Sequence, residues 1–258
     1  MFWVLSGKKL KRTLVATVAL VFAAGIYYAN KQNINVFSME NEGPQAYYSV
    51  KTDDKVLALT FDISWGEEIV GPVLDTLKEA NLNKATFFLS SPWAKSHPDV
   101  VKRIVDMGFE VGSHGHKHEN FSEHDEAWMR EQITKAHQIL ADVTGQKRIN
   151  LIRLPNGDFD KRTLNVANSL GYRVIQWDTD SLDWMRKSAD EIVQRVTSKA
   201  HPGDIVLFHA SDSAKNTPEA LPRVIKELRE KGYSFATVSE LIAGSTIKTD
   251  PVEDAKSD

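Results

Sequence analysis

Apolar runs alternate with stretches of helical periodicity along most of the chain. Six stretches place apolar residues at helical spacing, at about 67–80, 98–107, 124–143, 160–170, 188–200 and 217–231. Seven apolar runs have the length and the β-branched or aromatic content of buried strands. They are VLALTFDI, ATFFLS, EVGSH, LIRLP, YRVIQWD, IVLFH and SFATVSEL. The alternation predicts seven successive β-α units.

Strands that are buried on both faces and separated by helices are typical of a parallel sheet. We therefore expect an α/β fold, namely a distorted (β/α) barrel with seven or eight parallel strands. The folded segment is near the lower size limit of a complete eight-stranded barrel, so an incomplete barrel fits better. A doubly wound open sheet is the alternative.

The two ends of the chain lack this alternation. The basic run KKLKR precedes an uncharged apolar stretch at 13–29, which predicts a basic flank and a transmembrane signal anchor over residues 1–29. A retained anchor would place the rest of the chain outside the cytoplasm; cleavage near Ala23-Ala24-Gly25 is the alternative. We expect a stalk over 30–51, the folded domain over 52–244 and a flexible polar tail over 245–258.

The composition excludes one class of partner and restricts the atoms that could bind a metal ion. With 32 Lys and Arg against 35 Asp and Glu, the net charge is −3, so the chain lacks the basic field that nucleic-acid binding requires. It has no cysteine, so a metal ion must be bound through nitrogen and oxygen. We expect a monomer that contacts the membrane through its anchor.

Polar residues gather at the carboxyl ends of five predicted strands. Because these ends meet at one rim of a parallel barrel, we expect the functional site there. The candidate side chains at this rim are Asp62, His114, His118, Arg153, Asn156, Asp183, Trp184, Leu207 and His209.

His114 and His118 follow the third strand with His-x-x-x-His spacing, which can turn two imidazoles toward one divalent ion. Taken alone, a His-rich loop fits a solvated turn equally well. His116 lies between the two and is an alternative third ligand.

Two pairs of side chains can perform acid–base chemistry. His209 follows an apolar strand, where an imidazole can act as a general acid or serve as a buried structural histidine. Asp183 can accept its second N–H and favour the protonated form. Arg153 can hold Asp62 ionised and ready to act as a base; a surface ion pair is the alternative.

The remaining rim residues are less specific. Trp184 and Leu207 can form apolar walls for a small group such as a methyl, or can belong to the core. Asp178 and Asp180 fit turn caps, and we assign them no catalytic role.

Five motifs in order, TFDISWG, SHGHKHEN, RLPNG, DSLDW and LFH, resemble those of the polysaccharide deacetylase family, also called the NodB homology domain or carbohydrate esterase family 4. The resemblance covers residues from about 55 to about 240 and implies a distorted barrel. It makes Asp62 the general base, His209 the general acid, and His114 and His118 the metal ligands. It also implies that Arg153 orients the base, Asp183 tunes His209, Trp184 and Leu207 line an acetyl pocket, and a backbone N–H at or near Asn156 binds the oxyanion.

The resemblance implies metal-dependent hydrolysis of N-acetyl groups on cell-wall polysaccharide, either peptidoglycan or a related glycan of N-acetylglucosamine and N-acetylmuramic acid. Zn²⁺ is the expected ion, with Co²⁺ or Mn²⁺ as alternatives. The first and third motifs are most similar to sporulation-associated members, so we expect a role in spore formation on the cell-wall or spore-envelope side of the membrane.

Ile63 departs from the family pattern. The family commonly has Asp or Asn at this place, as the third protein ligand of the metal, and isoleucine cannot coordinate an ion. The third motif also usually has an aromatic residue in place of Asn156. Two other functions therefore stay open: a catalytically weak or inactive glycan-binding protein of the cell wall, and an amide hydrolase that acts on a small molecule.

Overall fold

The computed structural model describes residues 43–244. The expected anchor, the first part of the expected stalk and the tail lie outside the described residues. Within the part that is described, no helix is long and apolar enough to cross a membrane.

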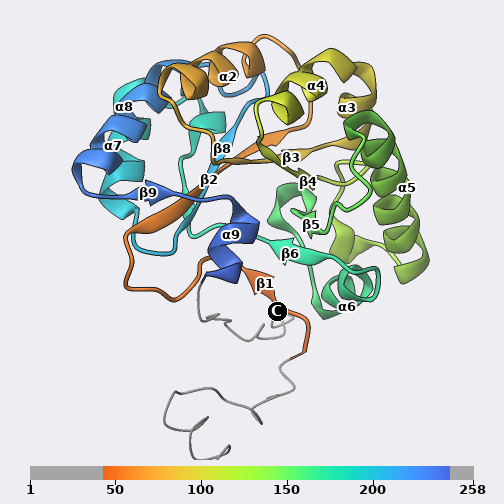
Figure 1. Cartoon of the computed structure of the whole chain (residues 1–258). Helices are drawn as coiled ribbons and strands as arrows, with labels where there is room; N and C mark the ends of the chain where they lie inside the picture. The colour runs from red at the N-terminus through yellow and green to blue at the C-terminus, as the bar shows by residue number, and fades with distance from the viewer. Residues whose placement is uncertain (1–42, 245–258) are drawn as a thin grey trace, which may run out of the picture. The chain divides into compact units, whose positions relative to one another are not determined.

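The described residues form one curled sheet in which every strand pair is parallel (Figure 1). The strand order is β1-β6-β5-β4-β3-β2-β8-β7, and β9 pairs with β2. The parallel α/β architecture is confirmed, as a curled half-barrel. Between residues 43 and 244 the sheet has nine strands, more than the seven or eight expected: β1 Ala46–Tyr47, β2 Val56–Ile63, β3 Thr86–Leu89, β4 Glu110–Ser113, β5 Leu151–Ile152, β6 Arg173–Ile175, β7 Thr179–Asp180, β8 Ile205–His209 and β9 Ser234–Phe235.

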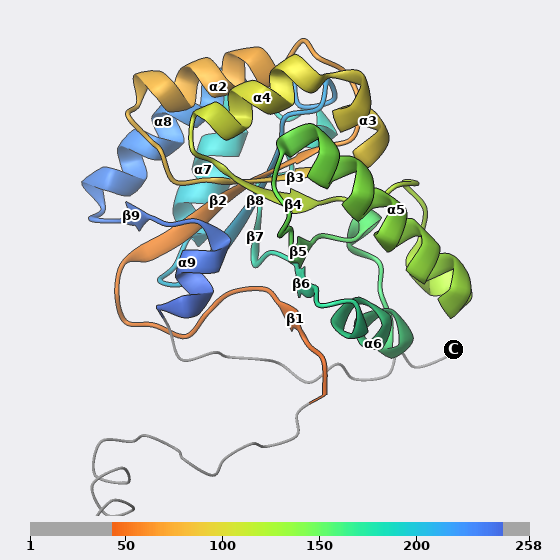
Figure 2. The same ribbon diagram turned by 45° about the vertical axis from the view of Figure 1, so that its right-hand side comes forward.

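Helices cover the outer face of this sheet (Figures 1 and 2). Six of them coincide with the predicted stretches to within a few residues, and the short α3 was not predicted. The outer helices are α2 Val70–Glu79, α3 Ser91–Ser96, α4 Pro98–Asp106, α5 Glu126–Thr144, α6 Lys161–Ser169, α7 Ala189–Lys199 and α8 Thr217–Glu230.

The last predicted strand is largely wrong. Of SFATVSEL, only Ser234–Phe235 pair with β2, and Val238–Ala243 form helix α9. Thr237 and Glu240 form a capping box, in which each side chain accepts the other residue's backbone N–H, and this motif starts a helix. Leu241 of α9 belongs to a hydrophobic cluster with Ala58 and Phe88 of the sheet.

The sheet also extends into the expected stalk. Ala46–Tyr47 pair with β6, and the backbone N–H of Val50 donates to the carbonyl of Gly203 at 2.8 Å. The folded part of the chain therefore begins before residue 52, the start that we expected. A strand of two residues is too short to produce a periodic pattern, so neither β1 nor β7 could be found by periodicity.

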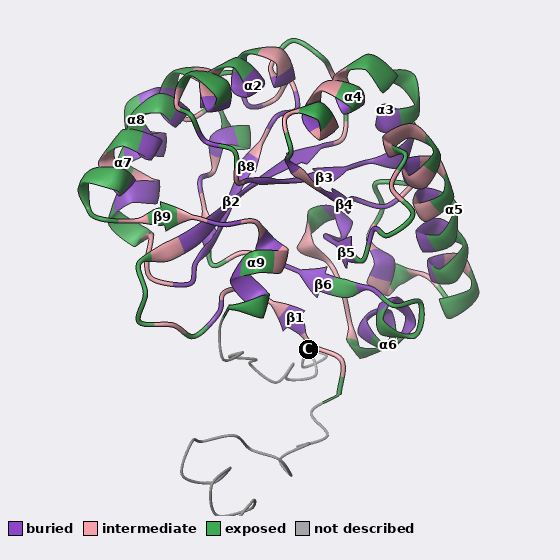
Figure 3. Cartoon of the chain, viewed as in Figure 1, coloured by how far each residue is buried: buried purple, intermediate pink, exposed green. Residues whose placement is uncertain are grey.

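The central strand β2 is buried on both faces (Figure 3) and divides its residues between two environments. Phe61 and Ile63 belong to the hydrophobic cluster between the sheet and the outer helices. Thr60 and Asp62 alternate with them and face the inner side, where both contact Arg153. The acid that ends this strand therefore faces the interior of the half-barrel, whereas Ile63 faces the helices.

Candidate active site

A buried ion pair fixes the carboxylate of Asp62. Its Oδ1 accepts a hydrogen bond of 2.8 Å from Nη1 of Arg153, and Arg153 is fully buried. The guanidinium also donates to the Thr60 hydroxyl and to the Gln176 carbonyl, and it lies 4.3 Å from the ring centre of Phe88. These contacts fix the guanidinium plane of Arg153, and its hydrogen bond in turn orients the carboxylate of Asp62.

The surroundings keep Asp62 ionised. Burial alone would raise the pKa of this carboxyl, but the charge and the hydrogen bond of Arg153, together with the charge of His209, hold its pKa below the usual range. A carboxylate that is ionised at neutral pH and fixed in place can accept a proton or bind a cation.

Asp183 fixes His209 in the same way on the neighbouring strand. Its Oδ1 accepts from Nδ1 of His209 at 2.8 Å, and its Oδ2 accepts from the His209 backbone N–H and from the Thr217 hydroxyl at 2.8 and 2.7 Å. Burial lowers the pKa of His209, but the hydrogen bond and charge of Asp183 prevail and raise it above 6.5. Because β2 and β8 pair with Asp62 opposite His209, the fixed carboxylate and the fixed imidazole lie on adjacent strand ends.

His114 and His118 lie together beside Asp62, with their ring centres 5.3 Å apart. The carbonyl oxygen of Arg153 can only accept, so His114 donates through Nδ1 at 2.8 Å and its Nε2 carries the lone pair. Burial lowers the pKa of His114 to about 4, which keeps the ring neutral. A neutral imidazole with a free Nε2 suits a metal ligand.

The third ligand position is not filled. Within residues 43–244, no cluster of three His, Asp or Glu side chains has the spacing that holds a metal ion. Ile63 lies in the hydrophobic cluster, and the alternative ligand His116 lies 2.9 Å from the Ser91 hydroxyl and does not line the cleft. The described residues therefore offer two imidazoles that could hold a divalent ion, fewer than the three protein ligands of most catalytic zinc sites.

A cleft of about 650 Å³ joins these groups at the rim. Seven of the nine residues predicted from the sequence line it, and Arg153 and Asp183 lie directly behind its wall as the partners of Asp62 and His209. Leu207 is buried, whereas Trp184 is half-exposed. The seven lining residues are Asp62, His114, His118, Asn156, Trp184, Leu207 and His209.

Sequence patterns missed several participants. Thr60 and Thr217 position the two ion pairs, and no local motif identifies either of them. Trp65 and Trp177 also line the cleft, as does Asp180, which was predicted as a turn cap and accepts from the backbone N–H of Leu182 at 2.8 Å. Trp65 is three residues after Asp62 in the chain, so its place at the rim could have been inferred from the sequence. Burial raises the pKa of Asp180 above its usual value.

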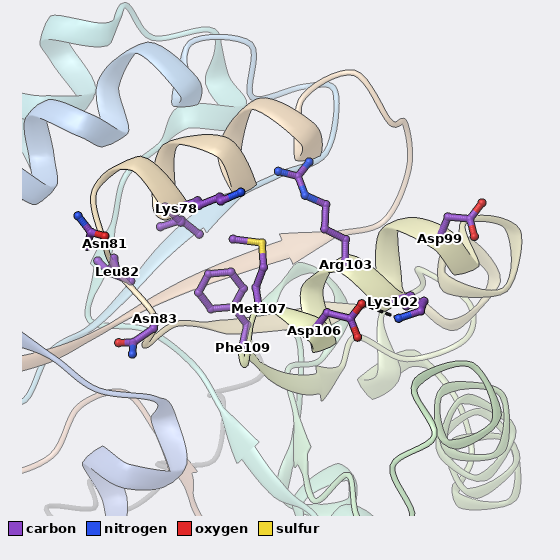
Figure 4. A pocket seen from close by; sticks show the side chains of 11 residues that line it. Lys78, Asn81, Leu82, Asn83, Asp99, Lys102, Arg103, Asp106, Met107 and Phe109 are labelled. Carbon is purple, nitrogen blue, oxygen red and sulfur yellow. Dashed lines mark hydrogen bonds and ion pairs between the residues drawn. The ribbon is translucent and has the colours of Figure 1, made fainter.

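A second cleft, of about 750 Å³, lies between α2 and α4 on the outside of the sheet (Figure 4). Its floor is apolar, with Leu82, Met107 and Phe109, and it contains no histidine. Lys102 and Arg103 at its edge are paired with Asp106 and Asp75. It therefore lacks the imidazoles and the carboxylate–arginine pair of the rim cleft, which we take as the candidate active site.

Comparisons with known proteins agree with this geometry. Residues 49–175 match the family model described as polysaccharide deacetylase. A peptidoglycan-N-acetylglucosamine deacetylase from Bacillus cereus is 34% identical over 191 residues, which cover 73% of this chain and 69% of that protein. An uncharacterized protein, YlxY of Bacillus subtilis, is 28% identical over 84% of this chain and 66% of its own length, just under two thirds.

Solved structures include an instructive relative. BA3943 of Bacillus anthracis, described as a pseudoenzyme of carbohydrate esterase family 4, superposes with a TM-score of 0.73 and 34% identity over 79% of this chain and 70% of that one. A mutant of the same protein, described as having restored enzymatic activity, matches equally well, with a TM-score of 0.73 and 35% identity over 79% of this chain and 73% of that one.

Proposed function

The chain belongs to the polysaccharide deacetylase family, and we propose that it hydrolyses N-acetyl groups on cell-wall polysaccharide, either peptidoglycan or a related glycan of N-acetylglucosamine and N-acetylmuramic acid. The observation that carries the proposal is the pair of fixed groups on adjacent strand ends, Asp62 held by Arg153 and His209 held by Asp183. A groove that only binds sugar needs neither an oriented base nor an oriented acid.

In this mechanism, Asp62 accepts a proton from the water that attacks the amide carbonyl. A backbone N–H at or near Asn156 stabilises the negative charge on the carbonyl oxygen. His209 then donates its proton to the leaving nitrogen as the C–N bond breaks, which yields acetate and a free amine. Leu207 and Trp184 form the apolar walls that accept the methyl group.

His114 and His118 would hold the divalent ion. Zn²⁺, or alternatively Co²⁺ or Mn²⁺, lowers the pKa of a bound water toward about 7 and polarises a carbonyl. Neutral water is a weaker nucleophile than hydroxide, and a carboxylate of low pKa such as Asp62 could remove the proton of a water whose pKa were lowered in this way.

The cellular setting of the proposal follows from the sequence. A signal anchor over residues 1–29 would place the domain outside the cytoplasm, where cell-wall glycan is the polymer at hand. The similarity of the first and third motifs to sporulation-associated members supports a role in spore formation. We expect the domain to act as a monomer.

Ile63 supports a second candidate function, that of a weak or inactive glycan-binding protein. It leaves the metal with two histidines, and the chain is similar over most of its length to the pseudoenzyme BA3943. The small-molecule amide hydrolase is disfavoured, because a domain outside the membrane meets polymers first.

One experiment separates the two candidates. Acetate release would be measured from N-acetylglucosamine oligomers and peptidoglycan fragments, with Zn²⁺, Co²⁺ or Mn²⁺ added in turn. We expect release that depends on the added metal. Retained glycan binding without release under any of the three metals would establish the non-catalytic function instead.

A further inference from the structure

Trp65 is an exposed aromatic residue at the mouth of the active-site cleft. It lies in the loop between β2 and α2, it lines the cleft, and 55% of its surface is exposed, more than for any other large hydrophobic residue from 43 to 244. The mechanism above gives it no role. A large aromatic side chain that stays exposed beside a cleft offers its apolar face to a ligand.

The loop that carries Trp65 is held from the β8–α8 side. The backbone N–H of Ser64 donates to the Ser211 hydroxyl at 2.9 Å. Asp212 accepts from three successive backbone N–H groups, those of residues 67, 68 and 69, at 3.2, 2.9 and 3.2 Å. These bonds fix the backbone on both sides of Trp65.

Gly66 also restricts the conformation of this loop. Its φ of +81° lies in the left-handed region, and a Cβ added there would lie 2.1 Å from Cγ of Asp212. Its carbonyl accepts a hydrogen bond from the indole of the buried Trp93 in α3. The backbone beneath the exposed indole is therefore pre-organised, which reduces the entropy lost when a ligand covers the ring.

The position of Trp65 relative to the base indicates what covers it. Asp62 is 4% exposed at the floor of the cleft, so the sugar unit that reacts must reach down to it, whereas Trp65 stands at the mouth. An indole face is apolar and suits the C–H face of a pyranose ring. We propose that Trp65 stacks against a second sugar unit, adjacent to the one that is deacetylated, and so makes the enzyme select oligosaccharides over single sugars.

This inference rests on the proposed function for its substrate class, but binding tests it separately from catalysis. The Kd would be measured for N-acetylglucosamine and for its β-1,4-linked tetramer with the wild type and with Trp65→Ala and Trp65→Phe. We expect Trp65→Ala to weaken tetramer binding roughly tenfold, as for the loss of one aromatic stacking contact. Monomer binding should stay unchanged, and Trp65→Phe should keep most of the tetramer affinity.

Leu170→Ala is the matched control, because Leu170 is exposed and lies outside the cleft. It should leave both Kd values unchanged. An unchanged tetramer Kd for Trp65→Ala, or an equal loss for monomer and tetramer, would overturn the inference even if the wild type releases acetate. Conversely, a wild type that releases no acetate but loses tetramer affinity through Trp65→Ala would overturn the proposed catalysis and leave the sugar contact standing.

Discussion

The acid–base side and the metal side of the active site differ in how completely their side chains are held in place. On the acid–base side, Asp62 and His209 each have a charged partner at 2.8 Å, and both partners are buried and bonded to a further group. On the metal side, two imidazoles lie together, and the neighbouring strand residue is the buried Ile63. Both proton-transfer residues therefore have the partner that orients them, whereas the metal side offers an ion only two histidines.

On the metal side, the largest effect should come from removing an imidazole. His118→Ala removes one of the two proposed ligands, and we expect the metal affinity to fall by more than about 100-fold, because the loss of a ligand costs more than the loss of a residue that supports one. Acetate release should fall with it at a fixed metal concentration. His116→Ala is the matched control, since His116 does not line the cleft, and it should retain both properties. Equal losses in the two variants would show that the whole loop, rather than His118, binds the ion.

On the acid–base side, Asp183→Asn should lower kcat roughly 100-fold, within the range of general acid catalysis. Asp183 raises the pKa of His209 against the effect of burial, through its hydrogen bond and its charge, so the loss of that charge should lower the pKa. His209 donates a proton, so activity is lost as the pH rises through its pKa, and the alkaline limb of the kcat profile should move to lower pH. Asp178→Asn, which lies outside the cleft, should leave the limb in place. An unmoved limb in Asp183→Asn would assign the proton donor elsewhere.

The difference between the halves can be reduced by Ile63→Asp. A carboxylate is unfavourable in the apolar layer that surrounds residue 63, and β2 ends there, so the side chain should turn toward the ion. We expect the Zn²⁺ affinity to rise at least about tenfold in a metal titration, as a gained ligand should outweigh a supporting contact. Ile63→Leu is the control without a donor atom. Unchanged affinity in Ile63→Asp would mean that the ion, if bound, lies away from the end of β2.

The smallest effect is expected at Asn156, whose contribution is a backbone N–H. Its φ of 59° is left-handed, so glycine can replace it without strain, whereas alanine costs roughly 1 kcal/mol there. We expect Asn156→Gly to change kcat/KM less than about threefold, since a backbone donor survives the substitution. A loss of 100-fold would instead assign the role to the Asn156 amide, which donates to Asn120 at 2.8 Å.

Features that depend on neighbouring residues in the chain could be predicted from the sequence, whereas contacts between residues far apart in the chain could not. VLALTFDI coincides with β2 to the residue, because a strand buried on both faces has a continuous apolar pattern. The contacts that complete the site have no such pattern: Thr217 is 34 positions from Asp183, and Thr60 is 93 from Arg153. The family resemblance predicted a missing ligand at Ile63, but only the register of β2 shows that this side chain faces the helices.

The central claim is that Asp62 is a working base although the metal has few ligands. Acetate release from the N-acetylglucosamine tetramer would be compared for the wild type and Asp62→Asn at equal bound metal, below the melting temperature of both. We expect measurable release by the wild type and a rate about a thousandfold lower for Asp62→Asn, with its metal content nearly unchanged. Equal rates for the two proteins, or no release by the metal-saturated wild type, would contradict the claim.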